Sequence, residues 1–202
     1  PYTQSNDPFN FSFDGWNALI KIDGGANKGD DKAGAFGIGK SAPFSNSYYR
    51  LIFYRTYNQK YERAAQGISR LMSYQNGALM TSGIGYYGEA EGNNPVEAIP
   101  ELDSINKRLK IGTDVFIYGF KSTSNWETEI TVALLENFLI SFYYGQLRVK
   151  VQGREINKKS LSRYVERIHR ERPGATKGTY GNYLALTRKE GVHTYSKNFH
   201  GM

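Results

Sequence analysis

Residues 34–44, GAFGIGKSAPF, combine closely spaced glycines with a lysine and a serine. Because glycine has no Cβ, main-chain N–H groups in such a segment can approach an anion closely, and the lysine adds a positive charge. The spacing of Gly34, Gly39, Lys40 and Ser41 fits the phosphate loop of P-loop NTPases, and residues 37–42 nearly fit the dinucleotide-binding pattern. The glycine-rich box of a different ATP fold is a third interpretation. Each of the three predicts a phosphate-binding site.

The elements around this segment argue against the first two interpretations. A P-loop and a dinucleotide-binding loop both follow directly on a buried strand. Residues 24–33, GGANKGDDKA, are instead polar and glycine-rich, which is typical of a loop. A P-loop enzyme also needs an apolar strand that ends in a magnesium-binding acid, and no such run follows. The alternatives that remain are the third ATP fold and a purely structural glycine turn with Lys40 in solvent.

The downstream pattern predicts an α+β sandwich with a mainly antiparallel sheet. Runs of aromatic and branched residues predict strands, and residues 75–77 predict a turn between the second and third of them. The predicted strands are residues 48–57, 63–74, 78–87, 112–120 and 147–151, with a weak one at 183–187. Helical spacing and capping residues predict helices near residues 16–20, 39–46, 126–144 and 158–172.

The two longer predicted helices differ in the pattern of their side chains. On residues 126–144 the predicted buried stripe is Ile130, Ala133, Leu134, Phe138 and Ile140. On residues 158–172 the predicted buried face is Leu161, Tyr164, Val165 and Ile168. Four basic residues of that second helix lie off the apolar face: Lys159, Arg163, Arg167 and Arg170.

The positive charge is concentrated at the C-terminal end of the chain. Residues 148–202 hold 13 Lys and Arg against 4 acids, whereas residues 1–147 hold 13 against 15. Lys159, Arg163, Arg167 and Arg170 are therefore candidate contacts for nucleic-acid phosphates, with an affinity that falls as salt rises. A solvated helix face is the alternative interpretation.

The composition excludes several other classes of site. The chain has no cysteine, so it can form neither a disulfide nor a cysteine-based zinc site. Its three histidines show no metal-ligand spacing, so no metal-binding residue is predicted from them. The longest apolar run, Val132–Leu135, is far too short to span a bilayer, and no signal peptide opens the chain. We expect a cytoplasmic protein without a membrane partner, and we expect a chain that starts at Pro1 to be a fragment or a processed form.

Several of these motifs together resemble the GHKL ATPases, the superfamily of gyrase, a heat-shock chaperone, histidine kinases and MutL. The resemblance is to a prokaryotic branch allied to MutL and MORC, with Ala33 in place of the first glycine of the box. The matching segments are Trp16 to Leu19, 24–33, 34–44, 66–71, 83–88, 112–117 and 136–138. Since they cover about residues 16–155, the chain is expected to hold an ATP-binding core at 1–155, incomplete at its N-terminus, and a basic helical extension at 156–202.

The resemblance implies a Bergerat-type two-layer sandwich, with a mixed, mainly antiparallel sheet and helices on one face. It implies ATP and Mg²⁺ as cofactors, and a homodimer as one possible assembly. Main-chain amides around Gly37, Ile38 and Gly39 would hold the β- and γ-phosphates, Lys40 would support them, and residues 24–33 would form a lid. Thr113 would lie near the adenine. The implied binding residues are Gly34, Phe36, Gly37, Ile38, Gly39, Lys40, Ser41 and Thr113.

The chain departs from the family at its N-terminal end. The family's catalytic Glu and magnesium-binding Asn lie on an N-terminal helix, and its adenine-reading Asp lies in a D-x-G box before the lid. Neither motif precedes Trp16, and Asp23-Gly24-Gly25 follows Trp16, so it receives no role. The catalytic residues are therefore unknown, and we expect this chain alone to be inactive as a hydrolase because no base is positioned to activate water.

Two functions follow for the full-length protein. The first is an ATP hydrolase that acts as a nucleotide-driven conformational switch, in a DNA-linked or phage-defence system. The second is a non-enzymatic nucleic-acid or protein interaction domain that keeps the glycine box as a structural turn.

Overall fold

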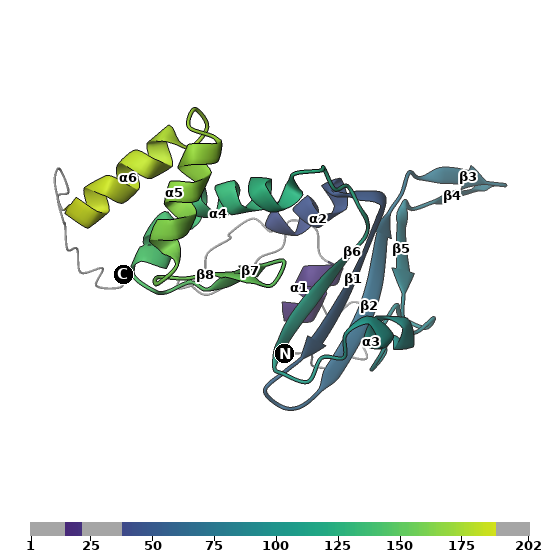
Figure 1. The fold of residues 1–202 in the computed structure, drawn as a ribbon. Coiled ribbons are helices and arrows are strands. Elements are labelled where there is room, and N and C mark those ends of the chain that lie inside the picture. Colours follow the sequence, from purple (N-terminus) through teal and green to yellow (C-terminus); the bar gives the residue numbers. More distant parts are fainter. Residues whose placement is uncertain (1–14, 22–37, 189–202) are drawn as a thin grey trace, which may run out of the picture. The chain divides into compact units, whose positions relative to one another are not determined.

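The computed structural model describes residues 15–21 and 38–188, and the chain divides into two compact units, residues 1–121 and 122–202 (Figure 1). The predicted boundary at residue 155 lies inside the second unit. The reason is that the helix at 126–143 and the hairpin after it share one core with the C-terminal helices. Each unit is described separately below.

The first unit is built on a four-stranded sheet in which all three strand pairings are antiparallel. Its strands, in spatial order, are β5 (Ile84–Tyr87), β2 (Arg63–Arg70), β1 (Ser47–Tyr57) and β6 (Gly112–Phe120). The predicted α+β class is thereby confirmed. The strands predicted at 63–74 and 78–87 are each broken in two, because β3 (Tyr74–Asn76) and β4 (Leu79–Thr81) leave the sheet as a separate hairpin (Figure 1).

The helices of the first unit cover both faces of this sheet. Trp16 and Ile20 of α1 (Gly15–Ile20) and Phe44 of α2 (Ala42–Ser45) pack on one face. The residues of the sheet that they cover are Ile52, Tyr54, Ala64 and Ile68. Leu102 of α3 (Pro100–Ile105) packs with Ala65 on the opposite face. The prediction of helices on one face therefore holds for α1 and α2 but not for α3.

The second unit joins three helices and a hairpin around one core. Its elements are α4 (Trp126–Tyr143), β7 (Val149–Val151), β8 (Arg154–Ile156), α5 (Leu161–Glu171) and α6 (Lys177–Arg188). Gln152 and Gly153, with φ angles of 47° and 74°, form the two-residue turn between β7 and β8 that this pair of positive φ angles favours. The buried face predicted for α5 is confirmed, since Leu161, Tyr164, Val165 and Ile168 all lie in the core.

Two predictions about this unit are wrong. In α4 the buried residues are Thr131, Leu135, Leu139 and Phe142, whereas Ile130, Phe138 and Ile140 are exposed. Apolar residues surround most of this helix, and non-helical backbone angles at Phe138 shift its faces, so the spacing alone selected the wrong stripe. The weak strand predicted at 183–187 lies within α6, because Tyr180, Tyr183 and Leu186 pack on the core at helical spacing.

Phe142→Ala should lower the free energy of unfolding of the second unit by about 3–5 kcal/mol, because it leaves a cavity around a side chain that is fully buried. Urea unfolding can be followed through Trp126, which packs on the same core, in a Trp16→Phe background. Phe138→Ala is the matched control on the same helix, since Phe138 is 47% exposed. Equal losses for the two variants would contradict the core described here.

Candidate functional site

The described end of the glycine box is an exposed helical turn that leads into β1. Ile38–Ser41 form a 3-10 helix, and α2 follows without a break. Phe44 in α2 is buried in the core on the sheet, whereas Gly39 is exposed and Lys40 and Ser41 are half-buried. Phe44 therefore holds this segment against the sheet, whereas Gly39 at the other end of the segment stays accessible to solvent. Gly34, Phe36 and Gly37 lie outside the described residues.

Within the described part of the protein, neither packing nor backbone conformation requires a glycine at position 39. A Cβ built on it meets no heavy atom within 4 Å, and the residue lies in a 3-10 helix rather than in the left-handed region. Gly67 in β2 is the opposite case, since a Cβ there would lie 2.6 Å from the Phe53 ring. Packing thus accounts for glycine at position 67 but not at position 39. Space beside Gly39 is what a ligand that approaches the main chain needs.

Hydrogen bonds tie the far end of α2 to the end of β6. The main-chain N–H of Lys121 donates to the Asn46 carbonyl at 2.8 Å, and Lys121 Nζ donates to the Ser45 carbonyl at 3.0 Å. Ser47 Oγ donates to the carbonyl of Tyr118 at 2.5 Å. These contacts join the segment after the glycine box to the strand that begins with Gly112, Thr113 and Asp114.

Thr113 lies at the other end of that strand pair. It is exposed on β6, opposite Thr56 of β1, and the two hydroxyl oxygens are 3.1 Å apart. Ser47, directly after α2, pairs instead with Phe120. Thr56 is nine positions after Ser47 on β1, which is about 30 Å along an extended strand. The described residues therefore do not bring Thr113 beside Gly39, Lys40 and Ser41.

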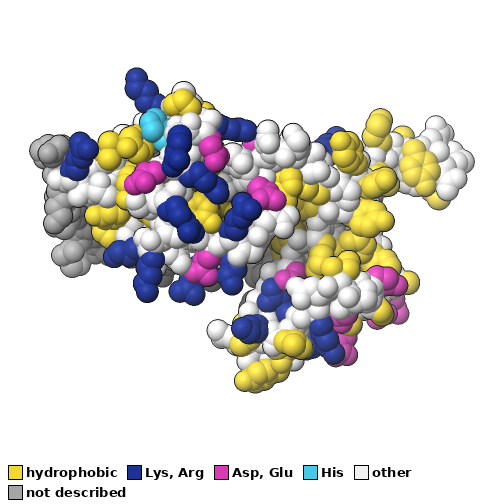
Figure 2. Space-filling model, in the orientation of Figure 1, with side chains coloured by type: hydrophobic (Ala, Val, Ile, Leu, Met, Phe, Trp, Pro, Cys, Tyr) yellow, Lys and Arg dark blue, Asp and Glu magenta, His cyan; other side chains and the backbone are white. Residues whose placement is uncertain are grey.

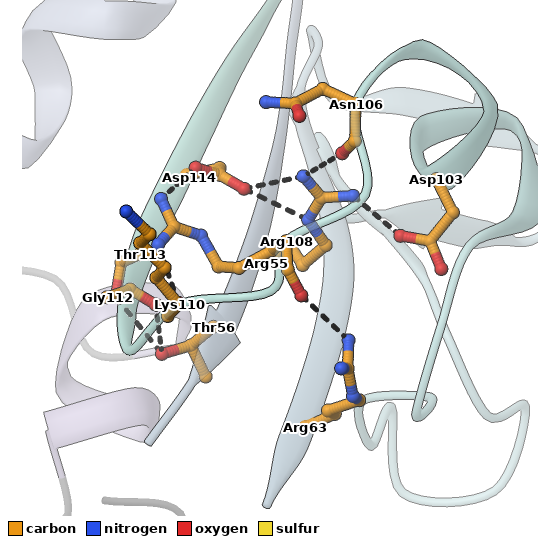
Figure 3. Close-up of polar contacts among 10 residues, drawn as sticks. All are labelled: Arg55, Thr56, Arg63, Asp103, Asn106, Arg108, Lys110, Gly112, Thr113 and Asp114. Atoms are coloured by element: carbon orange, nitrogen blue, oxygen red, sulfur yellow. Dashed lines mark hydrogen bonds and ion pairs between the residues drawn. The ribbon is translucent and has the colours of Figure 1, made fainter. Parts of the chain in front are cut away.

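Next to Thr113 is a charged network that the sequence interpretation missed (Figure 3). The guanidinium of Arg55, only 3% exposed, donates to Asp114 Oδ2 at 2.6 and 3.0 Å and to Asp103 Oδ1 at 2.6 Å. Its Nη2 also donates to the Asn106 carbonyl at 2.5 Å, and Arg108 forms an ion pair with the second carboxylate oxygen of Asp114. This network fixes α3 and residues 106–111 against the start of β6.

The network also sets the acidity of Asp114. The hydrogen bond from Arg108 lowers the pKa of this carboxyl below its usual value, and the hydrogen bond from Arg55 lowers it further, against the opposite effect of burial. The one sequence signal for this network was a charged residue in the middle of the run YYRLIFYRTY, where alternation places Arg55 on the same face as Phe53. The other members of the network, Asp103 and Arg108, are distant from Arg55 in sequence and carried no signal.

The lowered pKa predicts a specific loss of stability in acid. Asp114 contributes fully above the pKa of an unfolded aspartate, about 3.9, and its contribution disappears as the pH falls through the lower folded value. Thermal unfolding of the wild type at pH 7 and pH 3 should therefore differ more than that of Asp114→Asn, which is already less stable at pH 7. Parallel acid losses in the two proteins would rule out this role.

The four predicted basic residues do not form one site. Arg163 and Arg167 line a hollow of about 430 Å³ in the second unit, together with Arg154, Glu155 and Tyr164. Lys159 precedes α5 and is exposed, and Arg170 is exposed near its C-terminal end; neither lines this hollow. Arg154, which lies in β8, was not among the predicted contacts.

Comparisons with protein-family profiles, with curated proteins and with solved structures found no match to this chain. The family resemblance of the motifs therefore stays a prediction. Among residues 15–21 and 38–188, no group of three or more His, Asp or Glu side chains is placed to hold a metal ion. Across the same residues, no helix combines the length and the hydropathy needed to cross a bilayer.

Proposed function

We propose that this chain carries the nucleotide-binding core of a GHKL-type ATPase, and that the full-length protein uses ATP as a conformational switch. The observation that carries the proposal is Gly39. It belongs to the glycine box, and it occupies a helical turn where the described residues leave open space in place of a side chain. Open space at this position is what a phosphate that approaches the main-chain N–H groups needs, and the motif of the glycine box distinguishes Gly39 from other glycines with the same open space, such as Gly178.

The sheet supports the same choice among the three interpretations of the box. P-loop and dinucleotide-binding folds place their glycine loops on a parallel sheet. The strand that follows the box here, β1, is antiparallel to both of its neighbours in the described sheet. The ATP fold with a mainly antiparallel sheet is the interpretation compatible with this pairing.

Calorimetric titration of the full-length gene product with Mg-ATP tests this function. Gly37→Ala should weaken binding by about tenfold or more, since a Cβ obstructs the approach of the main chain to phosphate without a change of charge. Lys40→Ala should weaken it as well. Gly174→Ala is the control, because a Cβ at Gly174 meets nothing within 4 Å and this residue lies in the other unit. Full-length protein that binds no nucleotide, or binds ATP equally well as Gly37→Ala, would overturn the proposal.

A further inference from the structure

Basic side chains of the second unit gather on the face formed by α5 and the β7–β8 hairpin (Figure 2). The hollow of about 430 Å³ lies on this face, and its lining residues are Arg154, Glu155, Arg163, Tyr164 and Arg167. A smaller hollow of about 150 Å³ shares Arg154, Tyr164 and Arg167 with it. Three guanidinium groups from β8 and α5 therefore surround one recess.

Tyr164 orients two of these guanidinium groups. Its ring is almost fully buried, and the Cζ atoms of Arg163 and Arg167 lie 5.5 and 5.0 Å from the ring centroid. Cation–π contacts of this kind limit the freedom of both side chains before any ligand binds. The Nε of Arg167 is buried and has no hydrogen-bond partner, since its ion pair with Glu171 is 3.8 Å long.

Among the described residues, Glu155 is the one carboxylate in the lining of the recess, and Glu127 and Glu171 line the smaller hollow beside it. Glu155 lies 3.4 Å from Arg148 and 3.9 Å from Lys150, so its charge is already shared by two cations outside the lining. Within residues 122–188, Arg154 and Arg163 have no carboxylate within 4 Å. An anion that enters the recess would meet guanidinium groups, whose planar donors suit phosphate oxygens.

The arrangement of the cations favours a polymeric phosphate. Arg163, Arg167 and Arg170 follow one another at spacings of four and three residues on α5, which is about 6 and 4.5 Å along its axis. Such a row suits successive phosphates of one strand, and the recess is large enough for a phosphate with its sugar. A membrane surface fits less well, because the apolar face of α5 is already buried in the core and cannot enter a bilayer.

We propose that this recess binds the sugar–phosphate backbone of nucleic acid, with Arg154, Arg163 and Arg167 in contact with phosphates. Arg154, which is distant in sequence from the helix, completes the site with Arg163 and Arg167. The contacts are to phosphate rather than to base edges, so binding is tolerant of sequence and strongly dependent on salt. The site lies entirely within the second unit.

Fluorescence anisotropy with labelled single-stranded DNA, duplex DNA and RNA of one sequence, at several KCl concentrations, tests this proposal on the full-length protein. The triple variant Arg154→Gln, Arg163→Gln, Arg167→Gln should lose about 30-fold or more in affinity for the preferred nucleic acid at 100 mM KCl. The slope of log K against log salt should become shallower by about two to three, since each lost phosphate contact removes about 0.7–0.9.

The matched control removes the same charge from the first unit. Lys60, Lys107 and Lys110 are exposed there, and changing all three to Gln should leave the affinity within about twofold, because they do not line the recess. The single variant Arg154→Gln tests binding in a protein that should stay folded, since Arg154 is exposed and makes no cation–π contact with Tyr164. It should reduce affinity about threefold to tenfold with an unchanged melting temperature.

Three results would overturn the proposal. One is a wild type that binds none of the three nucleic acids. A second is an equal loss in the recess triple and the control triple, which would show general attraction to a basic protein. A third is competition by polyglutamate that equals competition by nucleic acid of the same charge, which would point to an acidic protein partner.

Discussion

Arg55→Met should lower the free energy of unfolding of the first unit by about 3 kcal/mol, because it leaves the partly buried carboxylates of Asp103 and Asp114 without their shared partner. Arg55 is 3% exposed and serves Asp103, Asp114 and the Asn106 carbonyl at once. Arg108 still pairs with one carboxylate oxygen of Asp114 in this variant, which limits the loss of stability at that residue. The larger effect is expected at Asp103, which has no other cation among its contacts in the described residues.

Urea unfolding followed through Trp16, in a Trp126→Phe background, measures this loss. Arg50→Met is the control on the same strand, since Arg50 is exposed and its loss should cost less than about 0.5 kcal/mol. The double variant Arg55→Met, Asp114→Asn should lose less than the sum of its single variants, because both remove one shared interaction. A stability of Arg55→Met that equals that of Arg50→Met would show that the network does not hold α3 and β6 together.

Gly39→Ala should separate nucleotide binding from folding. A Cβ at this helical position meets no heavy atom of the described residues within 4 Å, so the substitution should keep the melting temperature or raise the stability by about 0.5–1 kcal/mol. The same Cβ lies where the proposed phosphates approach the main chain, so ATP affinity should fall by about tenfold to a hundredfold, or about 1.4–2.8 kcal/mol of binding free energy. Calorimetry gives the affinity, and thermal unfolding without nucleotide gives the stability.

Gly178→Ala is the matched substitution for this test. Gly178 lies in α6, and a Cβ there also meets nothing within 4 Å. It should therefore raise stability in the same way and leave ATP affinity unchanged. If Gly39→Ala and Gly178→Ala bind ATP equally tightly, then the open space beside Gly39 is not where the nucleotide binds.

The local pattern of apolar and polar residues predicted those elements in which one face is clearly more apolar than the other. β6 has the predicted limits, Gly112–Phe120, because its branched and aromatic residues are bounded by glycine and by polar segments. The buried face of α5 was predicted because its apolar residues form a single stripe between charged ones. In both cases the sequence itself distinguishes the inner face from the outer one.

The buried face of α4, the Arg55 network and the recess depend on contacts between segments that are distant in sequence. A local sequence pattern does not encode such contacts. In α4 apolar residues lie on every side, so only the packing of α5 and α6 selects Leu135, Leu139 and Phe142 as the inner face. The network of Arg55 needs the register of β1 against β6, which pairs Arg55 with Asp114. The recess needs Arg154 of β8 beside α5, a contact that exists only once the hairpin has folded.

Amide hydrogen/deuterium exchange of the full-length protein, with and without saturating Mg-ATP, tests the central claim most directly because it reports on the main-chain N–H groups themselves. Peptides that cover residues 34–41 should exchange more slowly when ATP is bound. Peptides that cover the β3–β4 hairpin, residues 74–81, should exchange equally with and without ATP. Unchanged exchange throughout residues 34–41 at a concentration that saturates ATP binding would contradict the account.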